Sequence, residues 1–362
     1  MKRKKEEVKR KKRKDYMSTS KRVEPTLKEW KDLYRAAVNF RDLECWEWMY
    51  DGDVFGVQNP DTGEIGYCCV LGNQGEVFSL NVYLGEKGLK GYLQIANQAQ
   101  QVDKMDLFHL QDCLMASFEN RGELNTKDLN IINKLNLTFR GKNQWPLFRR
   151  LRPGFFPWYL TREEAQFLTV ALQQAKNVAL KVKKNNEMLI PVEHDLYYVM
   201  VPEKKEDKFK WKGNWIRIEL EPDTLQIPAL NDFYVNRIKK DSTAKGGGWE
   251  IDYFYHPSAV QDKKGEVPYY PLVCLFVERS RGLIIGFHMT AETDYLKEFL
   301  DKFLSLIENN KTIPSKIFVK KEQLYHVFTK IAEQLGIRLD LVEKFKYLEE
   351  AKQGMFKKMQ MR

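Results

Sequence analysis

Apolar positions in the C-terminal part of the chain form short runs and alternations that predict strands, with helical spacing between some of them. The predicted strands are residues 249–256, 270–278, 283–289, 317–319 and 337–342. Between the third and fourth strands, and again between the fourth and fifth, apolar side chains recur every three or four residues, as on the buried face of a helix. The expected order is therefore strand, strand, strand, helix, strand, helix, strand.

This order of elements is typical of ribonuclease-H-like domains. Strand–helix–strand units of this length predict parallel pairing with right-handed crossovers. We therefore expect residues 191–362 to form an α/β domain with a mixed sheet of ribonuclease-H-like strand order. Residues 241–248, which contain three consecutive glycines, are expected to form a flexible loop before the first of the five strands.

Residues 25–145 are expected to form an α+β domain. Thr26 and Glu29 have the spacing of a capping box, in which each side chain satisfies the other's free backbone amide, and an amphipathic helix follows. Turn residues then separate three short strands, and two helices and a fourth strand complete the domain. The predicted strands are 54–57, 65–71, 77–84 and 113–118, and the later helices are 88–101 and 126–135.

Residues 146–190 are expected to connect these two domains. Three prolines near the start of this connector predict a stiff extended segment. A second capping box, formed by Thr161 and Glu164, opens the longest predicted helix at 161–184. The Lys- and Asn-rich residues 183–186 then indicate the boundary of the second domain, which is expected to begin with strands near 196–201 and 215–220.

Composition fits this organisation. The chain has 362 residues, of which 43% are hydrophobic, enough for two domains with separate cores. No apolar run approaches the roughly 18 residues that span a membrane, so we expect no membrane contact. Five scattered cysteines, without a C-x-x-C pair, are typical of reduced, buried thiols and favour a cytoplasmic location.

The net charge of +10 comes mainly from the N-terminus. Residues 1–14 hold ten Lys and Arg against two Glu, whereas the remaining 348 residues hold 50 basic and 48 acidic groups. Residues 1–24 are therefore predicted to be a disordered basic arm, and residues 1–14 could hold nucleic acid or another polyanion by counterion release. Two other interpretations stay open: the arm is a solubilising tail, or translation starts at Met17 instead of Met1 and the arm is absent.

Acidic residues near the ends of the predicted strands raise the question of metal-dependent chemistry. Two-metal cleavage of a phosphodiester needs carboxylates that converge on two cations about 4 Å apart. The candidates are Asp252 in the first strand, Glu292 or Glu298 near the first helix, and Glu322 after the fourth strand.

Two lysines argue against such a site. The fourth strand runs into Lys320 and Lys321, where a nuclease of this architecture would need an aspartate, and the two ammonium groups would compete with a cation. The alternative interpretation is that these acids are ordinary surface groups in a fold that kept its shape without the chemistry. We predict no metal site.

Basic and aromatic residues alternate where the first domain joins the connector. Cations for phosphate and flat rings for bases are what single-stranded nucleic acid requires. The candidate binding residues are Arg140, Lys142, Arg149, Arg150, Arg152 and Trp158. The alternative is structural, because aromatic side chains in a proline-rich connector can fill a seam between domains.

Two further groups of residues carry weaker signals. Gly85, Gly88 and Gly91 precede a predicted helix but lack the spacing of a phosphate-binding loop, and turn formation explains them. His256 and His288 fall at predicted strand ends near Asp252, so they could join a site there; a partly buried, hydrogen-bonded imidazole is the alternative.

Several short motifs resemble one uncharacterised bacterial family of two-domain proteins. They are FGV at 55–57, NPDTGEIGYC at 59–68, RPGFFPW at 152–158, WEID at 249–252 and PSKI at 314–317. The resemblance covers most of residues 25–345 and implies a soluble bacterial protein of two domains. It implies no activity, no cofactor and no catalytic residues. Members often have an acid after the fourth strand, where this chain has Lys320, and the basic arm is outside the family pattern.

The sequence thus predicts a non-enzymatic binding or adaptor protein of the cytoplasm, without a cofactor, that contacts nucleic acid, another polyanion or a protein. The alternative is a divergent metal-dependent nuclease or nucleic-acid-binding protein that uses Asp252 and an acid from a helix.

Overall fold

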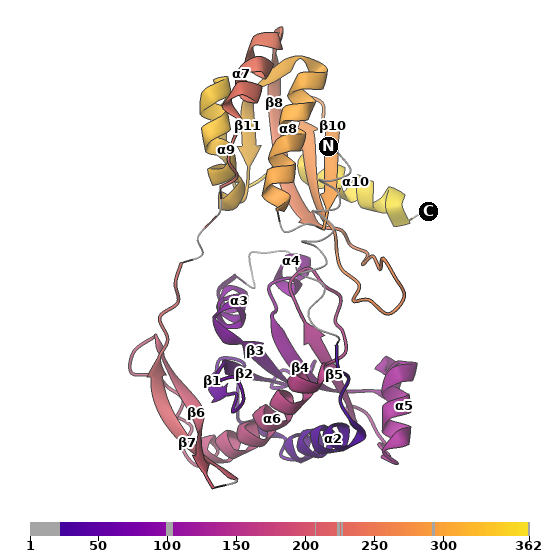
Figure 1. The fold of residues 1–362 in the computed structure, drawn as a ribbon, viewed down its shortest axis with the longest axis vertical. Helices are drawn as coiled ribbons and strands as arrows, with labels where there is room; N and C mark the ends of the chain where they lie inside the picture. The colour runs from indigo at the N-terminus through magenta and orange to yellow at the C-terminus, as the bar shows by residue number, and fades with distance from the viewer. Residues whose placement is uncertain are drawn as a thin grey trace. The chain divides into compact units, whose positions relative to one another are not determined.

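The chain divides between Glu221 and Pro222 into two compact units, each described here by itself (Figure 1). The computed structural model describes residues 22–98, 104–206, 208–222, 225, 227–291 and 294–360. Residues 1–21 of the predicted arm, which include the alternative start at Met17, and the candidate Glu292 lie outside these residues. The last three residues of the arm are not disordered as predicted, because Arg22 donates to the Tyr159 carbonyl, the Val23 carbonyl accepts from the Arg162 amide and Glu24 pairs with Lys127.

A mixed seven-stranded sheet forms the centre of the N-terminal unit, in the order β5-β4-β3-β2-β1-β6-β7. Its strands are β1 (Phe55–Gln58), β2 (Ile65–Leu71), β3 (Ser79–Leu84), β4 (Cys113–Glu119), β5 (Trp145–Leu151), β6 (Leu196–Lys205) and β7 (Lys208–Arg217). Neighbouring strands are antiparallel except β1 and β6, which are parallel. Such a parallel pair requires a crossover connection, and the segment between β1 and β6 contains β2, β3, β4 and β5.

Helices cover both faces of this sheet. The helices are α2 (Leu27–Arg41), α3 (Gly85–Gln98), α4 (Lys104–Phe108), α5 (Thr126–Lys134) and α6 (Arg162–Val182), with short 3-10 turns η1 (Cys45–Glu47) and η2 (Arg121–Glu123). The larger core lies under α2 and α6, and a smaller core, which includes Leu89 of α3, lies on the other face. Both predicted capping boxes are present, at the starts of α2 and α6. This unit is the predicted α+β domain.

The boundaries of the first domain differ from the prediction. The predicted connector at 146–190 supplies most of β5 and all of α6, so it is part of the sheet and its core. Strands β6 and β7, predicted to open the second domain, pair with β1 instead. The physical reason is burial, because Val199 and Met200 of β6 are almost fully buried in this unit.

A five-stranded sheet forms the centre of the C-terminal unit, in the order β10-β9-β8-β11-β12. Its strands are β8 (Ala244–Tyr255), β9 (Leu272–Glu278), β10 (Leu283–Thr290), β11 (Thr312–Val319) and β12 (Arg338–Leu341). Strands β8, β9 and β10 are antiparallel neighbours, and β11 is parallel to both β8 and β12. The predicted ribonuclease-H-like strand order of this α/β domain is confirmed.

Helices also flank the second sheet on both faces. They are α7 (Asp232–Asp241), α8 (Tyr295–Asn310), α9 (Glu322–Leu335) and α10 (Leu348–Gln360). Successive residues of these strands face opposite sides of the sheet. One side forms the core under α7, α8 and α9. Helix α10 packs against the other side, on residues of β8 and β9 (Figure 1). Helix α7 was not predicted; the Asn231 side chain caps its first turn.

The predicted flexible loop at 241–248 is wrong, because its glycines belong to strand β8. Gly246 and Gly248 pair with β11, with Pro314 and Lys316 as their partners. A Cβ atom on Gly248 would lie 2.7 Å from the Phe318 ring, so the absence of a side chain permits this close approach. Among the helices that the structure describes, none is long and apolar enough to span a bilayer.

Candidate functional site

Asp252 forms an ion pair with Lys321 at the centre of the second sheet. Because β11 pairs in parallel with β8, the residues that follow β11 come level with Asp252. Lys321 Nζ lies 3.3 Å from Asp252 Oδ1, donates a hydrogen bond to the Tyr253 carbonyl, and lies 4.4 Å from the centroid of the Tyr253 ring. The sequence predicted that Lys320 and Lys321 would act at this end of β11. Of the two side chains, Lys321 points toward Asp252, whereas Lys320 is exposed.

Burial determines the electrostatics of this pair. Asp252 is 7% exposed, and removal from water raises the pKa of its carboxyl, while the Lys321 ammonium acts in the opposite direction. A carboxylate inside a protein needs a partner of opposite charge, and Lys321 supplies one from the protein itself. Any added cation at Asp252 would meet the Lys321 ammonium at close range.

Glu250, which the sequence analysis missed, is the second acid on this face of β8. It is fully buried, and its carboxylate accepts hydrogen bonds from the backbone N–H groups of Lys346, Tyr347 and Leu348 at 2.7–2.9 Å. Arg279 Nε lies 3.3 Å from the same carboxylate. Glu250 therefore fixes the start of α10. Its two-residue spacing from Asp252 was the available signal, because such residues share one face of a strand.

The remaining candidate acids lie elsewhere. Glu298 of α8 is 2.9 Å from His288 Nε2 of β10, on the sheet face opposite to Asp252. Glu322 is exposed at the first residue of α9. Over the described part of the chain, no three His, Cys, Asp or Glu side chains come together as metal ligands. The structure thus forms two separate pairs, Asp252–Lys321 and His288–Glu298.

A tyrosine–glutamine network lies beside the Asp252–Lys321 pair. The Tyr253 hydroxyl donates to Gln323 Oε1, and Gln323 Nε2 donates to the Tyr295 hydroxyl at 3.0 Å. Burial raises the pKa of the Tyr253 hydroxyl well above its usual range, so it stays protonated. This network joins β8, α8 and the start of α9, and it fixes the segment that carries Lys321.

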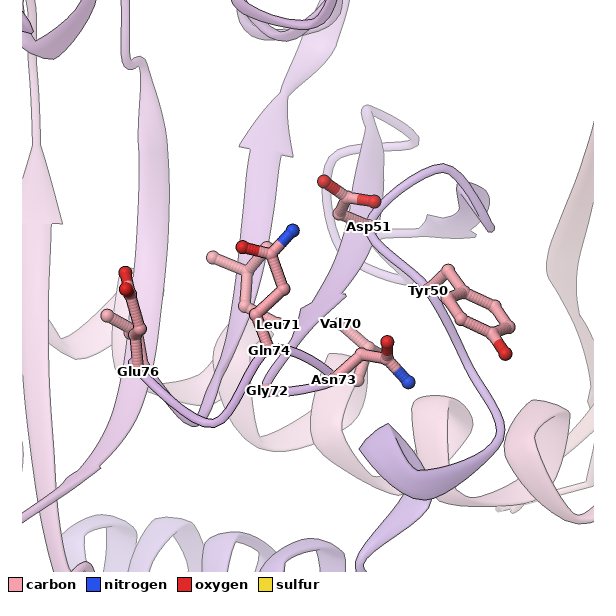
Figure 2. Close-up of a pocket in the computed structure, with 9 residues that line it drawn as sticks. Tyr50, Asp51, Val70, Leu71, Gly72, Asn73, Gln74 and Glu76 are labelled. Atoms are coloured by element: carbon pink, nitrogen blue, oxygen red, sulfur yellow. The ribbon is translucent and has the colours of Figure 1, made fainter.

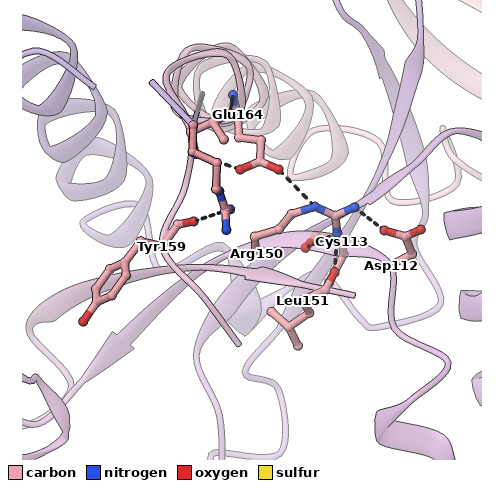
Figure 3. Close-up of polar contacts among 8 residues, drawn as sticks. Asp112, Cys113, Arg150, Leu151, Tyr159 and Glu164 are labelled. Carbon is pink, nitrogen blue, oxygen red and sulfur yellow. Dashed lines mark hydrogen bonds and ion pairs between the residues drawn. The ribbon is translucent and has the colours of Figure 1, made fainter. Parts of the chain in front are cut away.

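Two of the predicted binding arginines lie inside the N-terminal unit. Arg149 makes a double contact with Asp128 at 2.7 and 2.9 Å. Arg150 contacts Asp112, lies 3.2 Å from Glu164 Oε1 and donates to the carbonyls of Cys113 and Leu151 (Figure 3). Both guanidinium groups are buried and paired with carboxylates, so Arg149 joins β5 to α5, and Arg150 joins β5 to β4 and to the start of α6.

The other predicted binding residues are less buried, and each has different surroundings. Arg140 and Lys142 are exposed, and Arg152 lies 5.9 Å from the centroid of the Phe155 ring. Trp158 pairs through its backbone with Arg150, at 2.7 and 3.0 Å, and adds a short antiparallel bridge beside β5. The segment predicted as a connector is thus anchored to the edge of the first sheet.

Two hollows in the N-terminal unit are each lined by both polar and apolar residues. Figure 2 shows the first, a hollow of about 190 Å³ at the turn between β2 and β3; Tyr50, Asp51, Val70, Leu71, Gly72, Asn73, Gln74, Glu76 and Val77 line it. The second, of about 420 Å³, lies beside α2 and α6; Arg35, Ala36, Asn39, Leu172, Gln173, Gln174, Lys176, Asn177 and Trp211 line it. Sequence reasoning identified neither, because residues from separate elements form them.

Comparison with known families divides the chain in the same way as the structure. Residues 30–200 match a domain of unknown function, DUF7309, and residues 234–356 match a second domain of unknown function, DUF6930. The first match ends within β6, and the second begins within α7. No curated protein matches the chain.

Proposed function

We propose that this protein, which carries two domains of uncharacterised families in sequence, is a non-enzymatic binding protein. Its second domain uses a ribonuclease-H-like sheet as a scaffold for contacts and not for metal-dependent cleavage. The observation that carries the proposal is the ion pair between Asp252 of β8 and Lys321 just beyond the end of β11, with 3.3 Å between Lys321 Nζ and Asp252 Oδ1.

The chemistry of the two buried acids supports this proposal. Metal-assisted cleavage needs carboxylates that are free to bind cations. Asp252 is paired with an ammonium group, and Glu250 accepts three backbone N–H groups of α10 and contacts Arg279. If Asp252 bound a metal ion instead, the Lys321 ammonium would lose its partner, and breaking a buried ion pair costs about 3–5 kcal/mol. If Glu250 did so, the backbone N–H groups at the start of α10 would lose their acceptor.

A cleavage assay tests the proposal directly. The full chain is incubated with single- and double-stranded DNA and RNA in the presence of Mg²⁺ or Mn²⁺, beside Asp252→Ala and the surface control Glu333→Ala. We expect no metal-dependent cleavage by any of the three proteins. Cleavage that Asp252→Ala abolishes and Glu333→Ala preserves would overturn the proposal and establish the divergent nuclease.

Nucleic acid is the first partner class to test, because residues 1–14 hold ten basic side chains. Binding of the full chain is compared with that of a shorter version beginning at Met17, across a salt series. A phosphate-binding arm predicts that only the full chain binds and that affinity falls steeply with salt. Equal binding would move the contact to the folded domains, and binding by neither would favour a protein partner.

A further inference from the structure

Strand β10 forms one edge of the second sheet, and its one ionisable side chain, His288, contacts Glu298 on the α8 side. Its sequence from Leu283 to Thr290 contains no Asp, Glu, Lys or Arg. Three of its apolar side chains, Ile284, Phe287 and Met289, are 44–50% exposed. We call these three residues the β10 patch. Natural sheets protect exposed edges with charge, proline or bulges. In β10 a register shift lies between Ile284 and Gly286, but no proline, Asp, Glu, Lys or Arg protects the second half of the strand, so this apolar edge indicates a surface that another strand covers.

The β10 patch continues a buried apolar layer. Phe287 and Met289 pair with Leu275 and Val273 of β9, whose side chains lie under α10 and are almost fully buried. Helix α10 contacts β8 and β9, and over the described residues its core contains no side chain of β10. The helix therefore covers the centre of this face and stops before the edge strand.

We propose that the β10 patch binds a second copy of this chain, with the two β10 strands antiparallel about a two-fold axis. The two five-stranded sheets then continue into one sheet. In this arrangement Phe287 and Met289 of one copy lie beside the same residues of the other. An isologous contact of this kind uses one surface twice, so a single uncharged strand is complementary to itself.

Charge at the two ends of β10 supports the antiparallel direction. Arg281 precedes the strand; its side chain is 76% exposed and its Nε lies 3.6 Å from Glu278 Oε2 in the same turn. The exposed Asp294 follows the strand at the start of α8. In an antiparallel pair, the basic end of each strand lies beside the acidic end of the other. A parallel pair would place like charges together, which is unfavourable.

The size of the surface fits a weak dimer, because its apolar area is less than half of the total area that each partner buries in a standard interface. Three half-exposed large side chains offer on the order of 300 Å² of apolar area per copy, against about 800 Å² in total per partner in a standard interface. The outer backbone groups of β10 supply the remaining contacts as ladder hydrogen bonds. The irregularity between Ile284 and Gly286 confines regular pairing to the second half of the strand.

Sedimentation of the full chain over a range of concentrations tests the proposal. We expect the wild type to be dimeric, and Phe287→Lys to raise the dissociation constant at least about tenfold, as removal of a central apolar anchor does. The matched control is Phe233→Lys on α7, where the same substitution replaces a phenylalanine that is 91% exposed. Circular dichroism and thermal unfolding establish that both variants are folded.

Charge exchange provides an independent readout that does not depend on the apolar substitution. Arg281→Glu and Asp294→Arg should each weaken the dimer at low salt, and the double variant should regain most of the lost affinity. The proposal fails if the wild type is a monomer at all concentrations, or if Phe287→Lys and Phe233→Lys have equal effects. It also fails if the double variant is weaker than both single variants.

Discussion

Asp252 is the residue at which the electrostatics of the second domain can be tested by pH. Burial raises the pKa of this carboxyl, so the native state keeps its proton to a higher pH than the unfolded chain does. Above the unfolded pKa of about 3.9, the native state therefore binds more protons, and its stability falls as pH rises through the native pKa. The Asp252→Asn variant lacks this titration.

We predict that the free energy of unfolding of the wild type falls relative to that of Asp252→Asn as the pH rises from about 4. Urea unfolding of both proteins at a series of pH values measures this difference. The variant leaves Lys321 without its carboxylate at every pH, and this adds a constant to the difference in unfolding free energy between the two proteins. The test is therefore how that difference changes with pH, and not its size at any one pH. A difference that grows in favour of the wild type with rising pH would contradict the assignment.

Sequence reasoning identified the key acid of the site but not its partner. Asp252 stood out as an acid in a buried strand, and the lysines after the fourth strand were the expected competitors for a cation. The choice between Lys320 and Lys321 depends on how the chain leaves β11 beside β8, and the sequence does not specify this. Glu250 was missed because its backbone partners begin 96 residues later, at the start of α10.

At the scale of elements, α3 approaches the chain before β4 so closely that two of its residues must be glycine. A Cβ atom on Gly91 would lie 2.2 Å from the Leu110 carbonyl oxygen, and one on Gly88 would lie 2.8 Å from the Asp112 carbonyl oxygen. Close backbone packing, and not turn formation, therefore explains these two residues. Gly85 differs, because it starts the helix with a φ of +57°.

We predict that Gly91→Ala lowers the free energy of unfolding by about 1–3 kcal/mol, because a rigid backbone atom must move to admit the methyl group. The control is Gly354→Ala in α10, where a Cβ atom would meet nothing within 4 Å. There, the higher helix propensity of alanine should stabilise by up to about 1 kcal/mol. Chemical denaturation measures both, and equal effects would show that α3 can shift without loss.

Elements with local signals were predicted better than elements defined by their partners. The capping boxes of α2 and α6 lie within four residues, and both helices were located correctly. Strand β5 was predicted to be part of a connector because its proline and two arginines hide the strand pattern. Asp128, Asp112 and Glu164 pair with those arginines only in the folded unit. Strands β6 and β7 were recognised as strands but given to the wrong sheet.

At the scale of the whole molecule, the structure divides the chain near residue 221, whereas the sequence placed the second domain from residue 191. We predict that fragments 15–221 and 222–362 each fold with a cooperative unfolding transition, because each contains a complete sheet and core. A fragment that ends at residue 190 lacks β6 and β7, leaves β1 as an edge and loses the core residue Met200. Its free energy of unfolding should therefore fall by at least about 2–5 kcal/mol, the cost of emptying one large buried site. Circular dichroism and urea unfolding measure this, and equal stability of fragments 15–190 and 15–221 would return the boundary to residue 191.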